Sequence, residues 1–371
     1  MGYLRVKGEM HTTLPLPAKI DQIDGIQLLR AVAVLLVAWF HSGAPIEGNH
    51  PRNLPDLGVF GVDIFFVISG FIMSTILLRP TLGPGPAASW YFLKRRLLRI
   101  FPIYWVFAGL VALRMLRSHV LFMDNYWPSV FLLPALTYPH FALLVPFSWT
   151  LVFELMFYSV VGLMLLVTAR HAVTVSMAAI LGAVACGAVV GVQHPVAVIA
   201  LNPMLLEFVM GMLVALAYQR FGRQKMVGIV VLGMEVAAAV YLRAFPPQAA
   251  DGMHMVLAGT KVIQRVLTWG CAAALIVGGM VFWSPSMKSS VGGFFVLLGN
   301  SSYSAYLVSA WALKFVSRAM LKVSVEGQEA SLAAVVLMRL IVVASVFFAG
   351  WLCYQFIEWP LIRKLGRIVG R

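Results

Sequence analysis

Apolar stretches long enough to cross a lipid bilayer recur along nearly the whole chain, separated by short polar segments. A transmembrane helix needs about 20 predominantly apolar residues, and these stretches approach or exceed that length. The pattern predicts an all-α polytopic membrane protein with about ten membrane-spanning helices. The expected spans are residues 26–44, 58–78, 100–117, 148–168, 172–192, 196–218, 226–243, 262–283, 293–316 and 332–357.

One apolar stretch, Tyr126–Trp149, does not fit this scheme because prolines interrupt it. Proline removes a backbone donor and clashes with the preceding turn, so a continuous spanning helix is not expected there. We interpret it as an outer, partly re-entrant segment with aromatic anchors and as a candidate lid over a cavity. Its prolines are Pro128, Pro134, Pro139 and Pro146.

The basic residues set the expected orientation. Most of the 28 Lys and Arg residues fall in segments that lie inside if the N-terminus is cytoplasmic. This bias predicts that both termini and the loop 79–99 are cytoplasmic and that 117–147 faces outward. The expected organisation is a cytoplasmic N-terminal tail (1–24), a membrane domain (25–362) and a basic cytoplasmic C-terminal tail (363–371).

Composition supports the membrane assignment and excludes several other classes. Hydrophobic residues make up 61% of the chain and charged residues only 11%, about half the charged fraction of a soluble domain. The net charge of +14 does not indicate nucleic-acid binding, because the basic residues lie in short loops, where they face an anionic leaflet. Three cysteines far apart in apolar stretches, and histidines without HxxxH spacing, predict neither a disulfide framework nor a metal site.

Two ionisable residues within the first span, Arg30 and His41, point to chemistry. Eleven positions apart, they fall within about 20° of one another on a helix and about 16 Å apart along it. Ionisable side chains inside a membrane are unfavourable and usually mark a function. The alternative is that Arg30 reaches back to a lipid headgroup while His41 lies in the far interface.

Several further charged residues fall within or beside the spans. Asp63 begins the second span, where it either caps the helix or handles substrate. Glu154 lies inside the fourth span, where a carboxylate needs a partner or a proton and would suit proton transfer. Glu207 is also intramembrane, whereas Glu235 and Arg339 are interpreted as structural residues that could pair with one another.

The densest basic cluster is "FLKRRLLRIFPIYW" (Phe92–Trp105), in which Pro102 is expected to mark the start of the next helix. Arg96 and Arg99 are three positions apart and would share a helical face, where they could clamp a phosphate-bearing ligand. The simpler alternative is a juxtamembrane anchor to anionic lipid.

These motifs together resemble the acyltransferase-3 family. The resemblance covers about residues 24–366, and "NPMLLEFVMGMLVAL" (Asn202–Leu216) is most similar to its exopolysaccharide-production branch. The motifs that carry it, in the family's order, are Arg30-x10-His41, "GVDIFFVISGF", "RRLLRIFPIYW", "SWTLVFELMFY", "LLGNSSYSAYLV" and "YQFIEWPL".

The resemblance implies an O-acyltransferase of the bacterial inner membrane that moves acetyl groups from acetyl-CoA, or another acyl-CoA, to envelope or secreted polysaccharide. It implies no permanently bound cofactor; the partners are the donor, a polysaccharide or lipid-linked oligosaccharide, the bilayer and polysaccharide-assembly proteins. It also implies that the Arg30 and His41 pair is essential and that Arg96 and Arg99 handle the donor. Where the family often carries a second histidine, this chain has Ser309, to which no role is transferred.

A mechanism follows from the residue types. An unperturbed imidazole has a pKa near 6.5, so neutral His41 could take a proton from a sugar hydroxyl as it attacks a thioester. It could instead carry the acyl group as acyl-imidazole. Arg30 would orient the donor or stabilise negative charge, and Glu154 would fix the imidazole tautomer or shuttle its proton.

The same residues also allow two other functions. A transporter or flippase of lipid-linked sugar would use His41, Glu154 and Glu207 as a proton relay. A non-catalytic subunit of a polysaccharide machine would need none of these side chains. The ordered motifs favour the enzyme, and the sequence shows no inverted repeat of the kind many transporters have.

Overall fold

A computed structural model gives the fold of most of the chain. The residues it describes are 23–47, 58, 60–78, 83–117, 123–133, 143–145, 147–190, 195–244, 256, 261–309, 311–312 and 331–369.

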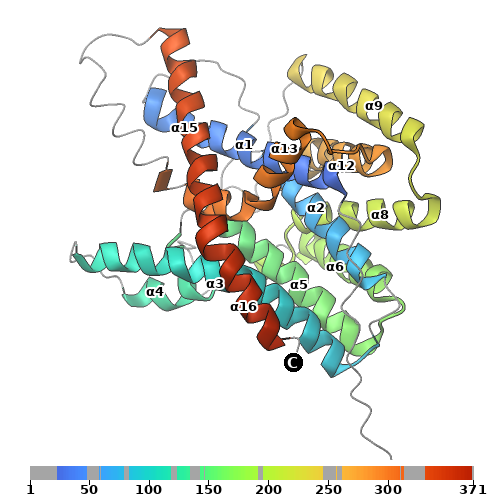
Figure 1. The fold of residues 1–371 in the computed structure, drawn as a ribbon. Coiled ribbons are helices and arrows are strands. Elements are labelled where there is room, and N and C mark those ends of the chain that lie inside the picture. The colour runs from blue at the N-terminus through green and yellow to red at the C-terminus, as the bar shows by residue number, and fades with distance from the viewer. Residues whose placement is uncertain are drawn as a thin grey trace, which may run out of the picture.

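Helices dominate the described residues, as Figure 1 shows. They are α1 (Asp24–Glu47), α2 (Phe60–Leu77), α3 (Pro86–Arg117), α4 (Met123–Val130), α5 (Trp149–Val167), α6 (Ala172–Val190), α7 (Pro195–Ala200), α8 (Leu205–Phe221), α9 (Lys225–Ala244), α11 (Val262–Arg265), the π-helical turn η2 (Val266–Gly270), α12 (Cys271–Trp283), α13 (Ser290–Asn300), α15 (Leu332–Cys353), the π-helical turn η3 (Tyr354–Glu358) and α16 (Trp359–Val369).

The fold is that of a multi-pass helical membrane protein. Within the described ranges, eight helices are long and apolar enough to cross a bilayer, or nine if a bent pair forms one span. That pair is Ser290–Asn300 and Ser302–Ser309, which meet at 57°. The expected span 226–243 coincides with α9, whose side chains after residue 235 lie outside the described set. The count of ten and the cytoplasmic position of both termini stay predictions.

Helix α3 corrects the expectation that a new helix starts at Pro102. It begins at Pro86, in a position that suits proline, and continues through Pro102 to Arg117. The proline interrupts one backbone hydrogen bond, but buried neighbours such as Ile103 and Tyr104 hold the helix in the core. Residues 86–99 are therefore helical, not a loop, and the basic cluster lies on a rigid surface.

The proline-rich segment is described only in part. Its first piece, α4, packs against α3: the Tyr104 hydroxyl donates to the Ser129 carbonyl, and Trp105 Nε1 donates to the Val130 carbonyl at 3.0 Å. Residues 134–142 and 146 lie outside the described set. Its role as a lid therefore stays a prediction.

Helices α2 and α8 cross in backbone contact because each presents a glycine. A Cβ atom at Gly70 would lie 2.1 Å from the Phe208 carbonyl oxygen, and one at Gly211 would lie 2.0 Å from that of Val67. Such close approach is how helices associate within a membrane, where no difference in hydrophobicity drives them together. The crossing fixes α2 beside α8.

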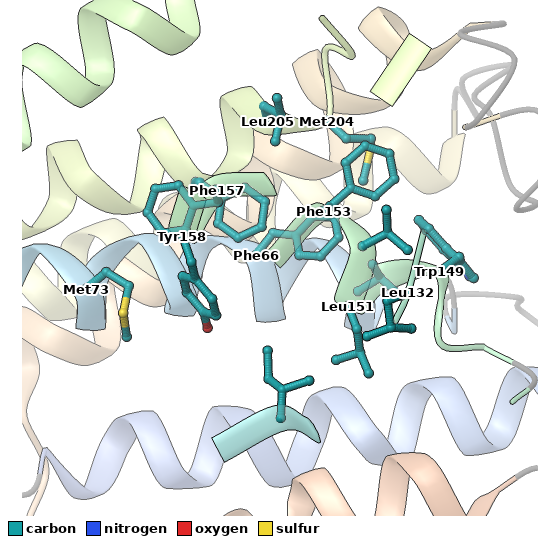
Figure 2. Packing of buried hydrophobic residues seen from close by; sticks show 14 of the residues in the cluster. Phe66, Met73, Leu132, Trp149, Leu151, Phe153, Phe157, Tyr158, Met204 and Leu205 are labelled. Atoms are coloured by element: carbon teal, nitrogen blue, oxygen red, sulfur yellow. The ribbon is translucent and has the colours of Figure 1, made fainter. Parts of the chain in front are cut away.

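An aromatic cluster joins α2 and α8 to α5. The ring centroids of Phe208 lie 4.7 Å from Phe66 and 4.5 Å from Phe157. Figure 2 shows the Tyr158 hydroxyl pointing away from the Phe66 and Phe157 rings. Helix α5 also packs beside α3, and α3 beside α16, as seen in the lower part of Figure 1. This packing holds one polar face of α5 toward α1 and α3, where the candidate site lies.

Candidate active site

A cavity of about 360 Å³ lies between α1, α2, α3, α5 and the short helix Ser302–Ser309. Its volume falls within the usual range for small-molecule sites, about 300–1,000 Å³. Most of its wall is apolar, but charged and hydroxyl groups from several helices converge on it. The polar residues that line it are Gln27, Arg30, Ser69, Thr75, Arg96, Arg99, Thr150, Glu154, Tyr158, Ser302, Tyr303 and Tyr306.

Three arginines from two helices meet at this cavity. Arg30 of α1 donates through Nη1 to Gln27 Oε1 at 3.2 Å and interacts electrostatically with Arg99 of α3. Arg99 is solvent-exposed, whereas Arg96 is half-buried and its Nε has no hydrogen-bond partner among the described residues. Three arginines gathered at one cavity favour an anionic ligand there. The sequence predicted the Arg96–Arg99 face, and the tertiary structure adds Arg30 to it.

Glu154 supplies negative charge to the same wall. Its Oε1 accepts a hydrogen bond from Ser69 Oγ at 2.8 Å, and its Oε2 accepts one from the Tyr158 hydroxyl at 3.1 Å. It also interacts electrostatically with Arg30 and Arg96. Because neither oxygen bonds to His41 in the described structure, the contacts do not support a role in fixing the imidazole tautomer. They support charge balance at the arginine cluster.

A second carboxylate, Glu358, approaches the cluster from the other end of the chain. It lies in η3, is 3% exposed and accepts a hydrogen bond from Ser304 Oγ. It interacts electrostatically with Arg30 and Arg99. Glu358 belongs to the motif "YQFIEWPL", but no pattern in the sequence singled out this residue. The available sequence signal was an acidic side chain at the end of the last apolar span. The structure adds that this residue lies in a π-helical turn, a type common at functional sites.

His41 lies outside the cavity lining but is joined to its wall. The imidazole stacks on the Phe147 ring, with centroids 3.8 Å apart and planes 26° apart. The Phe147 carbonyl accepts a hydrogen bond from the Tyr306 hydroxyl at 2.6 Å, and that hydroxyl lies 2.9 Å from Thr150 Oγ1. Tyr306 and Thr150 both line the cavity. The sequence predicted neither the stacking of His41 on Phe147 nor the hydroxyl contacts that join Phe147 to the cavity wall.

Asp63 is the one predicted donor-binding residue that the structure places elsewhere. Arg265 binds both of its carboxylate oxygens, from Nε at 3.0 Å and from Nη2 at 2.7 Å. The two side chains are 0% and 1% exposed, and neither lines the cavity. Glu207 is buried beside this pair, which separates it from the relay suggested with His41 and Glu154.

Arg339 and Glu235 are not joined in the way the sequence suggested. Arg339 lies in α15, which packs against α1, and its guanidinium carbon is 5.1 Å from the centre of the Trp39 ring. Glu235 lies in α9, which packs against α12. Neither residue lines the cavity. This agrees with a structural role for Arg339. Its guanidinium contacts an aromatic ring and does not form an ion pair with Glu235.

Comparisons with known proteins give the site a family context. Residues 23–368 match the profile of a family described as an acyltransferase domain. The exopolysaccharide production protein ExoZ of Rhizobium meliloti (strain 1021) is 30% identical over 315 residues, which cover 83% of this chain and 90% of that protein. Acyltransferase MdmB of Streptomyces mycarofaciens is 24% identical over 389 aligned positions, covering 95% and 94%.

A third relative matches a shorter region. BcsY of Komagataeibacter xylinus, to which membrane-bound transacylase activity is attributed, is 31% identical over 170 residues, covering 40% of this chain and 38% of BcsY. No solved structure matches the chain.

Proposed function

This chain belongs to the acyltransferase-3 family, and we propose that it transfers an acyl group, in the first instance acetyl, from acyl-CoA to a polysaccharide hydroxyl. The acceptor is a cell-surface or secreted polysaccharide or its lipid-linked precursor, and the enzyme resides in the bacterial inner membrane. The similarity to ExoZ, whose name refers to exopolysaccharide production, supports this acceptor class.

The observation that carries the donor assignment is the cavity where Arg30, Arg96 and Arg99 meet. A CoA thioester has phosphates at one end and the reactive carbonyl at the other. Arginine binds phosphate oxygens with charge-assisted hydrogen bonds, and the Arg99 side chain is exposed. Arg96 Nε and Ser302 Oγ are buried polar atoms at the wall without partners among the described residues, and a bound ligand would satisfy them.

Two residues near opposite ends of α1 have different roles in the proposed reaction: His41 transfers the proton and Arg30 binds the donor. The acceptor hydroxyl attacks the thioester carbon, and neutral His41 takes its proton as the new carbon–oxygen bond forms. The carbon–sulfur bond then breaks, and the imidazolium returns the proton to the departing thiolate. Arg30 lies about 16 Å along the helix from His41, so it binds the donor and does not contact the transferred proton.

We expect the double variant Arg96→Ala, Arg99→Ala to use donor poorly while its maximal rate changes little. Loss of one charge-assisted hydrogen bond removes roughly 1.5–3 kcal/mol of binding, so the apparent KM for acetyl-CoA should rise by at least about tenfold. The measurement is release of free CoA thiol by purified enzyme in detergent, as a function of acetyl-CoA concentration.

Arg95→Ala is the matched control for this experiment. Arg95 precedes Arg96 in α3, but its exposed side chain donates to the Tyr91 hydroxyl at 2.7 Å and does not line the cavity. Its loss should leave the donor KM within about twofold of wild type, the range of weak surface contacts. Equal KM values for all three proteins would contradict the donor site and leave the arginines as membrane anchors.

The acceptor class is tested in cells. Mass spectrometry of surface and secreted polysaccharides from strains with and without this protein should show loss of acetyl substituents in the deletion. Wild-type protein should restore them, and His41→Ala should not. A deletion that lowers the amount of exported polysaccharide but leaves its acetylation unchanged would instead favour a transporter.

A further inference from the structure

Phe147 adopts a backbone conformation that is unusual for its residue type. Its φ angle is 69°, in the left-handed region that bulky residues seldom occupy. Such strain persists only when surrounding contacts hold it, and it gathers at functional sites. The residue precedes Ser148, the N-cap of α5, and lies against His41, so the strained turn decides where its aromatic ring lies.

Hydroxyl groups from the cavity wall hold this turn in place. Tyr306 donates to the Phe147 carbonyl at 2.6 Å and is paired with Thr150 on the first turn of α5. The next residue, Ser148, is buried and donates through Oγ to the Val145 carbonyl at 2.8 Å. The short helix Ser302–Ser309 and the start of α5 thereby fix the position of Phe147 together.

The stacked geometry matters for the charge that develops on His41. A cation over an aromatic face is attracted by the ring's negative quadrupole, whereas the edge of a ring is positive. Phe147 stacks face to face with the imidazole at a centroid distance of 3.8 Å, whereas the Phe40 ring lies roughly perpendicular to the imidazole at 5.0 Å and 73°. In a partly buried setting, where an isolated charge is disfavoured, the face contact stabilises imidazolium relative to neutral imidazole.

We propose that Phe147 is a positioning residue whose ring face orients His41 and stabilises the imidazolium formed during acyl transfer, with Tyr306 holding it in that position. The inference rests on the proposed role of His41 as proton acceptor. During that step the acceptor O–H bond breaks, the proton joins the imidazole nitrogen and the imidazolium later returns it to the leaving thiolate. Phe147 exchanges no atoms; it acts through His41.

The test compares Phe147→Leu with Phe147→Tyr. Leucine keeps an apolar side chain but removes the ring face, so kcat should fall by about 3- to 30-fold, the range of cation–π contacts. The KM for acetyl-CoA should stay within about twofold. Tyrosine keeps the ring and should retain a kcat near wild type. Phe40→Leu is the matched control and should also stay near wild type, because it removes a more distant, perpendicular ring and leaves the stacked Phe147 ring in place.

Each outcome separates this inference from the proposed function. Wild-type kcat in Phe147→Leu, an equal loss in Phe147→Tyr, or a rise in KM without a change in kcat would overturn the inference alone. Full activity in His41→Ala would overturn it together with the proposed function. If Phe147→Leu fails to accumulate in membranes, Tyr306→Phe is measured instead. That variant removes the hydroxyl that holds Phe147, and a kcat equal to wild type would overturn the inference.

Discussion

His41→Gln is expected to lose acyl transfer by about 10²- to 10⁴-fold while the protein still inserts into the membrane at wild-type abundance. Glutamine keeps hydrogen-bonding capacity and a similar size but cannot accept a proton at neutral pH. His41 is half-buried against Phe40 and Phe147, so the substitution removes the proton acceptor with little loss of packing. CoA-thiol release, normalised to membrane abundance by immunoblot, measures the effect.

The companion variant for this experiment is Arg30→Lys. Lysine keeps the positive charge but lacks the planar group that can bind phosphate through two hydrogen bonds. We expect a raised donor KM, because Arg30 lines the cavity, whereas His41→Gln should mainly lower kcat. Wild-type turnover in His41→Gln would exclude the general-base mechanism. Wild-type behaviour in both variants would mean that Arg30 only reaches to a headgroup and that His41 is interfacial.

The second large effect is expected at the buried ion pair. Arg265→Ala leaves Asp63 charged and without its bidentate partner in the protein interior, which should destabilise the fold by about 3–5 kcal/mol. Membrane abundance should drop, and the midpoint of thermal unfolding in detergent should fall. Donor KM in the surviving protein should stay near wild type, because neither residue lines the cavity.

The control is the double variant Asp63→Leu, Arg265→Met. Replacing a buried ion pair by apolar residues of similar size is often neutral or stabilising, so this protein should recover part of the lost stability, although Glu207 then stays buried without Arg265 beside it. Full stability in Arg265→Ala would contradict the structural assignment. A raised donor KM with an unchanged unfolding midpoint would return Asp63 to the donor-binding role first expected from the sequence.

Much of the site could be predicted from helical periodicity. Arg96 and Arg99 share a face of α3 because residues three apart do so on any helix, and a similar argument aligns Arg30 with His41. The expectation that a helix starts at Pro102 was wrong, because core packing keeps the helix continuous despite a missing backbone donor. The surroundings of Asp63 were also missed, because its partner is 202 positions away in the chain. No local pattern carries such a pairing.

The sequence by itself determined the membrane-spanning helical fold. It also singled out the candidate site residues Arg30, Arg96, Arg99 and His41. Apolar length and helical spacing are local properties that do not depend on the rest of the chain. Only the tertiary structure decided that Glu154 bonds to Ser69 and Tyr158, that Glu358 reaches the arginines and that Phe147 covers His41. Apart from the Glu154–Tyr158 hydrogen bond, which joins neighbouring turns of α5, these contacts join segments far apart in the chain, and close packing of the helices selects them.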